Sequence, residues 1–135
     1  MRLYRGLKTH YRPDQVGGTA PYFGTDFTDC PYTALRYAAG RRGEVLVLDI
    51  GPATGLRISE EVWLGQQARR LMVWGRFDEL LAGVFPATLL RTQVHRKGIA
   101  SASDEYKARV LERFINESLQ EEGGSGQPRS ALRSP

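Results

Sequence analysis

Two short segments in the first 40 residues hold the side-chain types that could bind a charged small molecule. The first is Leu3-Tyr4-Arg5-Gly6, and the second runs from residue 22 to residue 29 into a segment that carries Ala34 and Tyr37. Arginine supplies most of the positive charge of the chain, and its forked guanidinium suits contacts to phosphate. Because a phosphate-bearing small molecule needs only one or two arginines, these segments are the first candidates for a site.

Several common catalytic patterns are absent from the sequence. It contains no Walker-type loop, no G-x-G-x-x-G, no G-x-S-x-G and no C-x-x-C. His10 and His95 have no partner at metal-ligand spacing, so we expect neither a metal site nor a Ser-His-Asp enzyme. The net charge is +4, but the basic residues are scattered. We therefore do not expect nucleic acid to be an essential partner.

The first half of the chain predicts three strands and a helix. Basic and apolar residues alternate over Arg2–Leu7, which is typical of a half-buried strand, and 22–27 indicates a second strand. Thr28 and Asp29 are candidate N-caps of a helix that would end at Gly40. The run Glu44–Ile50 has four consecutive apolar residues, so we expect a strand buried on both faces.

The second half of the sequence has weaker signals. Ser59 resembles an N-cap, and Leu64, Ala68 and Leu71 share helical spacing, so we expect a helix there. Gly83 and Pro86 are expected to break the chain before a strand at Thr88–Val94. From Tyr106 onward the pattern fits either a helix or a strand. Residues 121–135 are rich in Gly, Ser and Pro, which predicts a disordered tail after a domain over 1–120.

The N-terminal segments resemble those of the ADP-ribosyltransferase family. Members of that family open with a strand bearing Tyr-Arg-Gly, matched here by Tyr4-Arg5-Gly6. A strand-to-helix element of pattern F-T-x-x-P-x-x-A-x-x-Y-A follows, matched by FTDCPYTALRYA at Phe27–Ala38. The match covers roughly the first 50 residues. It implies a single-domain α+β fold with a split central sheet, flanking helices and a cleft for NAD+ between the two halves.

The resemblance also implies roles for particular residues. NAD+ would be the substrate, with Arg5 contacting a phosphate or the nicotinamide ribose, and Gly6 letting the backbone reach the nicotinamide amide. Thr28 occupies the family position that orients the catalytic glutamate, and Tyr37 or Phe27 could stack on nicotinamide. The family uses a glutamate at the start of a late strand to stabilise the ribose cation. Glu105 is the best-placed candidate, and it remains an ordinary first-turn acid if the segment after it is helical.

The implied activity is NAD+-dependent mono-ADP-ribosylation of a macromolecule, a protein rather than a nucleic acid, by a toxin or effector. Two alternatives stay open: an NAD+ glycohydrolase of the RES type, and an inactive nucleotide- or partner-binding module on the same scaffold. RES enzymes carry a glutamate in the helix where this chain has Arg36 and Tyr37.

The expected compartment follows from what the sequence lacks. Cys30 is the single cysteine, so an internal disulfide is impossible. No run approaches the ~18 apolar residues of a membrane helix, and residues 1–6 have no apolar signal-peptide core. We therefore expect a cytoplasmic protein with no membrane partner.

Overall fold

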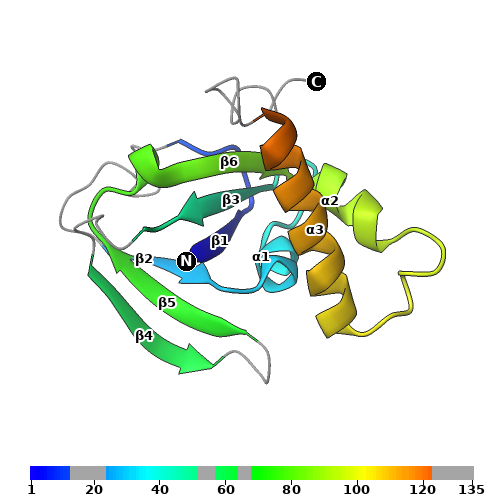
Figure 1. The fold of residues 1–135 in the computed structure, drawn as a ribbon, viewed down its shortest axis with the longest axis horizontal. Coiled ribbons are helices and arrows are strands. Elements are labelled where there is room, and N and C mark those ends of the chain that lie inside the picture. The colour runs from blue at the N-terminus through cyan, green and yellow to red at the C-terminus, as the bar shows by residue number, and fades with distance from the viewer. Residues whose placement is uncertain (13–23, 52–56, 64–67, 123–135) are drawn as a thin grey trace.

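The protein is an α+β domain built on one six-stranded antiparallel sheet with three helices (Figure 1). The structure is a computed structural model, and it describes residues 1–12, 24–51, 57–63 and 68–122. The strands are β1 (Arg2–Leu7), β2 (Gly24–Thr28), β3 (Glu44–Asp49), β4 (Arg57–Trp63), β5 (Arg69–Trp74) and β6 (Leu81–Pro86). The helices are α1 (Pro31–Tyr37), α2 (Ala87–Val94) and α3 (Asp104–Glu122), and a short 3₁₀ turn, η1 (Asp78–Leu80), precedes β6.

The strands lie in the order β4-β5-β2-β1-β3-β6, and every neighbouring pair is antiparallel. β1 pairs with β3 along its whole length, from Arg2 to Leu7, whereas it pairs with β2 at one position only, Tyr4 opposite Thr28. The sheet is therefore continuous, but its two three-stranded halves meet at a junction of a single residue pair.

Two hydrophobic cores lie on opposite faces of the sheet, and β3 belongs to both. Val45 and Val47 pack into the first core, whereas Leu46 and Leu48 pack into the second. All four side chains are fully buried. This alternation follows from the period of two residues in a strand, and it confirms the expectation that this strand is buried on both faces.

The helices cover the face of the first core, and Figure 1 shows them gathered on one side of the sheet. The second core is shared by the two halves of the sheet. It holds Leu3 of β1 together with Phe27 of β2 and Val73 of β5. Phe77 lies fully buried in this core, with its ring edge-on to Phe27 at 5.1 Å between ring centroids.

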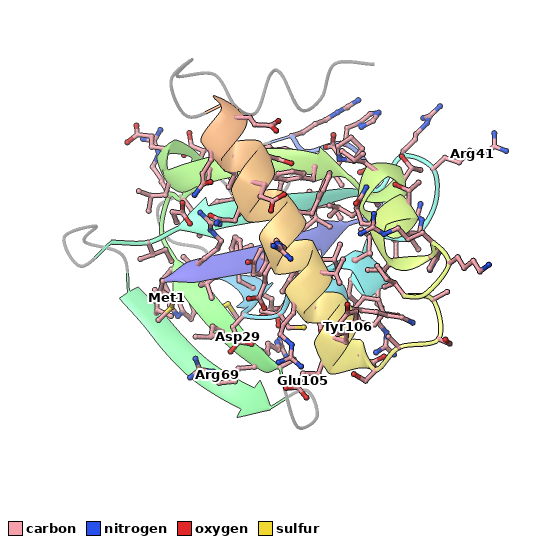
Figure 2. All side chains as sticks on the ribbon, turned by 45° about the vertical axis from the view of Figure 1, so that its right-hand side comes forward. Met1, Asp29, Arg41, Arg69, Glu105 and Tyr106 are labelled. Atoms are coloured by element: carbon pink, nitrogen blue, oxygen red, sulfur yellow. The ribbon has the colours of Figure 1, made fainter. Side chains whose placement is uncertain are left out.

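An ion pair between Asp29 and Arg69 joins β2 to β5 just beyond the end of β2. The carboxylate of Asp29 accepts hydrogen bonds from the backbone N–H of Arg69 at 2.8 Å and from its Nε at 2.9 Å. Figure 2 labels both residues. Because β5 is fixed to the end of β2 in this way, the register of these strands is well defined beside the single-pair junction.

Helix α1 begins at Pro31, a residue favoured in the first turn because its missing N–H has no helical partner there. Its N-cap is Cys30, which has no side-chain cap bond, so the expectation of Thr28 or Asp29 as N-cap is wrong. Thr28 ends β2 instead. At the other end, Arg91 of α2 donates to the carbonyl oxygens of Ala38 and Gly40, at 3.0 and 2.8 Å, which satisfies groups that follow the helix.

The strands expected at Arg2–Leu7 and from Glu44 onward are confirmed as β1 and β3. β2 covers the described part of the strand expected at 22–27, and residues 22 and 23 lie outside the described part of the chain. From Tyr106 onward the helical alternative is correct, since α3 begins at Asp104. Of the tail expected at 121–135, residues 121 and 122 belong to α3, and the rest lies outside the described residues.

Two elements expected in the second half are wrong. The region from Ser59, expected to be a helix, forms the strands β4 and β5, which pair with each other. The segment expected as a strand at Thr88–Val94 is the helix α2, and Pro86 serves as its N-cap. Gly83 does not break the chain, because it lies inside β6 opposite Val47.

Candidate functional site

A cavity of about 500 Å³ opens beside the single-pair junction of β1 and β2. This volume falls within the range of roughly 300–1,000 Å³ that is typical of small-molecule sites. Residues from β1, β2, α1 and β5 and the residue after β1 line it. They are Tyr4, Arg5, Gly6, Leu7, Lys8, Asp26, Phe27, Thr28, Ala34, Tyr37 and Arg70.

The cavity occupies the gap between the two strands and not one face of the sheet. Tyr4 packs in the first core and Leu7 in the second, on opposite faces of the sheet, yet both line the cavity. Gly6 faces α1, as shown by its contact with Ala34, whereas its neighbour Leu7 packs in the second core. A ligand in the cavity would therefore reach the edge of β1 where β2 has diverged from it.

Arg5 crosses the gap between β1 and β2. Its Nη1 donates to the backbone carbonyl oxygen of Asp26 at 2.8 Å, while its buried Nε has no hydrogen-bond partner among the described residues. Burial lowers the pKa of the Arg5 guanidinium below its ordinary value, and the nearby Asp26 carboxylate opposes that shift. The group stays charged at neutral pH. A half-buried guanidinium at the wall of a cavity is well suited to a phosphate.

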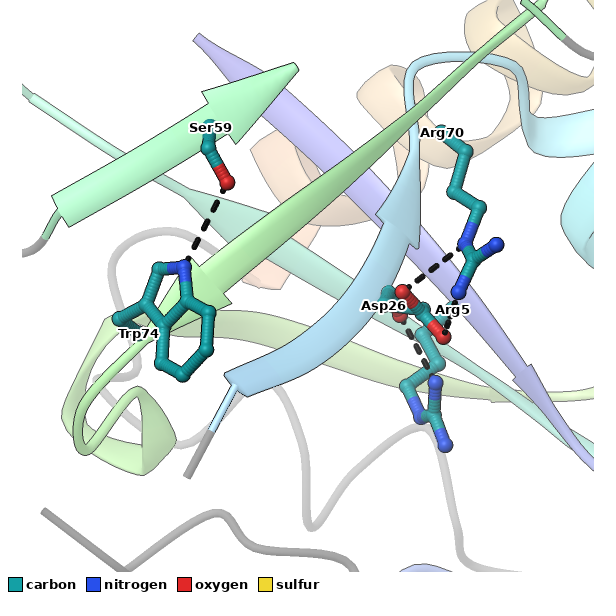
Figure 3. A network of polar contacts seen from close by, with 5 residues as sticks. All are labelled: Arg5, Asp26, Ser59, Arg70 and Trp74. Carbon is teal, nitrogen blue, oxygen red and sulfur yellow. Dashed lines mark hydrogen bonds and ion pairs between the residues drawn. The ribbon is translucent and has the colours of Figure 1, made fainter. Parts of the chain in front are cut away.

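Asp26 and Arg70 form a forked ion pair on the wall of the cavity. Arg70 Nε lies 3.0 Å from Asp26 Oδ1, and its Nη2 lies 3.0 Å from Oδ2. The pair is diagonal across the β2–β5 ladder, because Arg70 is opposite Thr28 and Asp26 is opposite Met72. Figure 3 shows Asp26 between the guanidinium groups of Arg70 and Arg5. Neither Asp26 nor Arg70 was among the site residues that the sequence indicated.

Thr28 lies at the junction, where it is 5% exposed. Its hydroxyl oxygen accepts a hydrogen bond of 3.3 Å from the backbone N–H of Cys30. That bond leaves the hydroxyl hydrogen free to donate, since a hydroxyl offers one donor and two acceptor positions. Thr28 is thus placed to contact a ligand in the gap and, at the same time, holds the turn that leads into α1.

The two candidate stacking residues differ in how much of each ring a ligand could reach. Phe27 is 2% exposed, and its ring packs in the second core against Phe77. Tyr37 is 59% exposed at the end of α1 and also lines the cavity. Of the two, Tyr37 presents the ring that a heterocycle could cover.

Gly6 is required by the packing of α1 on β1. A Cβ at this position would collide with the carbonyl oxygen of Ala34 and would lie 2.9 Å from the backbone nitrogen of Ala38. These are backbone atoms, which cannot rotate away. The absence of a side chain therefore brings the end of α1, and with it Tyr37, close to the strand that carries Arg5.

Glu105 is not among the residues that line the cavity. It is exposed and lies in the first turn of α3. Figure 2 labels Glu105 at this end of the helix. Its carboxylate is 3.7 Å from Arg109 Nη2, one helical turn along. The structure thus brings together Arg5, Gly6, Phe27, Thr28 and Tyr37, and it places Glu105 outside their cavity.

The side chains around the cavity carry an excess of positive charge. Arg5, Lys8 and Arg70 are cationic, and Asp26 is the only acidic side chain among the described lining residues. This balance favours an anionic ligand. In the described part of the chain, no group of three or more His, Cys, Asp or Glu residues is arranged to hold a metal ion. Nor does any described helix combine the length and the apolar character needed to cross a membrane.

Comparisons of the chain with protein-family models, with curated proteins and with solved structures found no match.

Proposed function

We propose that this chain binds NAD+ in the cavity between β1 and β2 and transfers its ADP-ribosyl group to a macromolecular acceptor. One observation carries the proposal. The five residues that the sequence motifs indicate for NAD+ come from β1, β2 and α1, and all five line a single cavity. They are Arg5, Gly6, Phe27, Thr28 and Tyr37. Their meeting supports the resemblance to ADP-ribosyltransferases because residues of three separate elements must be brought together by the fold to line one cavity.

The geometry fits the parts of NAD+ in turn. The pyrophosphate is an anion, and the cavity offers the half-buried guanidinium of Arg5 and the ammonium of Lys8. The nicotinamide is a flat ring with an amide, and the exposed ring of Tyr37 and the edge of β1 beyond Tyr4 suit such a group. Residues after Tyr4 have no partner on β2 in the sheet ladder. In that region the strand edge can offer backbone hydrogen bonds to the amide.

We also infer that the single-pair junction is the split of an ADP-ribosyltransferase-like sheet. A split sheet needs two halves that stay connected while leaving a slot for the dinucleotide. Here β1 and β2 meet only at Tyr4 and Thr28, and the cavity begins beside that pair. The position of the cavity at the junction supports this inference.

A binding module without catalysis is the second candidate, and the placement of Glu105 favours it. An ADP-ribosyltransferase needs a carboxylate near the ribose, and Glu105 lies on the exposed side of α3 and not in the cavity. The RES-type glycohydrolase gains no support, because α1 contains no carboxylate and Arg36 on that helix pairs with Asp104 at 3.5 Å.

The proposal is tested by titrating the protein with NAD+ in a calorimeter and comparing Arg5→Ala with Arg2→Ala. Arg5→Ala should weaken binding by roughly 1.5–3 kcal/mol, which is the scale of a hydrogen bond to a charged group. Arg2→Ala is the matched control, because it removes an arginine from the same strand whose partner is Asp49, outside the cavity.

Unchanged affinity in a folded Arg5→Ala variant would remove Arg5 from the site, and an absence of NAD+ binding by the unmodified protein would overturn the proposal. Chromatography of the products then separates the candidate activities. A modified acceptor indicates transfer, free ADP-ribose indicates hydrolysis, and bound but intact NAD+ indicates a binding module.

A further inference from the structure

The carboxylate of Asp26 is the one negative charge among the described residues that line the cavity. Cleavage of the bond between nicotinamide and ribose leaves a positive charge on the ribose, and a fixed negative charge beside it lowers the barrier. Within the proposed function, that role falls to a carboxylate. By its position in the sequence Glu105 was the best-placed candidate for this role, but it is outside the cavity, whereas Asp26 is on its wall.

Asp26 is held in place through both its main chain and its side chain. Its carbonyl oxygen accepts from Arg5 at 2.8 Å, and its two carboxylate oxygens each accept from Arg70 at 3.0 Å. A forked arginine–carboxylate pair fixes the plane of the carboxylate as well as its position. Preorganisation of this kind is what makes a charge effective in catalysis, because no reorganisation is needed during the reaction.

The forked pair leaves part of the carboxylate available to a ligand. A carboxylate has about four lone-pair sites, and the two hydrogen bonds from Arg70 occupy two of them. Asp26 is also 41% exposed at its side chain, so the remaining sites are within reach of the cavity. A ribose hydroxyl or a ribose cation can approach there while the pair with Arg70 stays intact.

We propose that Asp26 is the catalytic carboxylate of this site and that Arg70 is its positioning residue. The step is balanced as follows. The bond between C1′ of the ribose and the pyridinium nitrogen breaks, and its electron pair stays on nitrogen, so that neutral nicotinamide leaves. Asp26 faces the resulting oxocarbenium ion. The acceptor's oxygen or nitrogen, or water in hydrolysis, then bonds to C1′, and its proton passes to the Asp26 carboxylate and on to solvent.

This inference rests on the proposed function, and a ligand comparison tests it without knowledge of the acceptor. The first probe is ADP-ribose. The second is an ADP-linked pyrrolidine, whose ring is protonated at neutral pH and so imitates the charge of the ribose cation. Asp26→Asn keeps the shape of the side chain and removes its charge. It should weaken binding of the pyrrolidinium probe by about 10- to 100-fold, the scale of a charged hydrogen bond. Binding of ADP-ribose, which carries no positive charge beside C1′, should weaken by less than about 3-fold.

The matched control is Asp49→Asn, which removes the acidic partner from a similar forked pair between neighbouring strands. Arg2 Nε and Nη2 lie 2.7 and 3.1 Å from the Asp49 carboxylate oxygens, and neither residue lines the cavity. Asp49→Asn should leave both affinities unchanged. Equal effects of the two variants on the pyrrolidinium probe would mean that loss of an ion pair, and not loss of the cavity charge, is responsible.

Arg70→Gln tests the positioning role. It keeps the charge of Asp26 but frees the carboxylate to rotate, so it should weaken pyrrolidinium binding less than Asp26→Asn does. Asp26→Asn should fold, because Asp26 and Arg70 are 41% and 40% exposed and water can solvate the remaining partner. If it does not fold, the double variant Asp26→Asn/Arg70→Gln replaces it in the same comparison, because it removes both charges of the ion pair and leaves neither without a partner.

The outcomes separate the two proposals. If the unmodified protein binds NAD+ and the pyrrolidinium probe, and Asp26→Asn binds both as tightly, Asp26 is not the catalytic carboxylate and the NAD+ site stands. If the unmodified protein binds neither, the proposed function fails. Selective loss of the pyrrolidinium probe in Asp26→Asn supports both proposals.

Discussion

Gly6→Ala tests whether the end of α1 is packed directly on β1, the arrangement that sets one wall of the cavity. The added Cβ would collide with the carbonyl oxygen of Ala34 and lie 2.9 Å from the nitrogen of Ala38. That nitrogen donates to Ala34 and Leu35 at the C-cap of α1. The methyl group therefore cannot be accommodated unless the last turn of the helix moves.

The cost of this substitution follows from the atoms that are in contact. Overpacking a core costs typically about 1–3 kcal/mol, and the upper end applies here because the obstacles are backbone atoms. A loss of about 3 kcal/mol is a large share of the roughly 5–15 kcal/mol that holds an ordinary domain together. For a chain of 135 residues, it should lower the melting temperature by about 10 °C.

The measurement is urea unfolding followed by circular dichroism, with Gly51→Ala as the matched control. A Cβ at Gly51 would meet no atom of the described residues within 4 Å, so this variant should change the free energy of unfolding by less than about 0.5 kcal/mol. The slope of the unfolding transition with urea should be unchanged in both variants. If Gly6→Ala is as stable as Gly51→Ala, α1 does not approach β1 as described, and the argument for this wall of the cavity fails.

Two further substitutions probe the packing around the site. Arg91→Ala should lower the free energy of unfolding by about 1–3 kcal/mol, because the carbonyl oxygens of Ala38 and Gly40 lose their guanidinium donor; a change as small as that of the exposed Arg113→Ala would contradict this role. Burial raises the pKa of the Tyr4 phenol above its ordinary value of 10. As the pH rises, the phenol therefore loses its proton in the unfolded chain before it does so in the folded chain. The contribution of Tyr4 to the free energy of unfolding is thus complete below pH 10 and declines above it. Between pH 9 and pH 11 the unmodified protein should lose about 1 kcal/mol more than Tyr4→Phe, and equal losses in urea unfolding would contradict burial of the phenol.

The sequence correctly predicted the strands in which the order of apolar and polar residues directly reflects burial. The alternation in β1 and the apolar run in β3 reflect burial in the sheet, and each was correctly identified as a strand. The five residues indicated for NAD+ lie together for a related reason. They belong to β1, β2 and the end of α1, which follow one another along the chain and form one strand–strand–helix unit.

The second half was mispredicted because short apolar spacings fit more than one period. Ser59 and the acidic residues after it resemble a capped helix, but Ser59 lies in β4 opposite Met72 of β5. The strand period was present in β5, where Leu71 and Val73 are buried alternately. In α2 the buried residues Ala87, Leu90 and Val94 have helical spacing. Pro86 does mark a boundary, because β6 ends there, but the element that it precedes is a helix and not a strand.

Asp26 and Arg70 could not be paired from the sequence for the same reason. Their contact depends on the register of β2 and β5, which are separated by more than 40 positions, and β5 was expected to be helical. Asp26 itself lies in the segment that carries the family motif, so its place beside the site was visible. The signal that was missed is its position two residues before Thr28, on the same face of the strand.

The one-pair junction between β1 and β2 also has a mechanical consequence. Elsewhere in the sheet, separating neighbouring strands means breaking five or six paired positions at once, as between β1 and β3 or β2 and β5. Between β1 and β2 the ladder holds only at Tyr4 and Thr28, and the hydrogen bond from Arg5 to Asp26 spans the rest. A force that separates neighbouring strands would therefore part β1 from β2 more easily than any other pair in the sheet. A bound phosphate that drew Arg5 away from Asp26 would loosen the joint in which it sits.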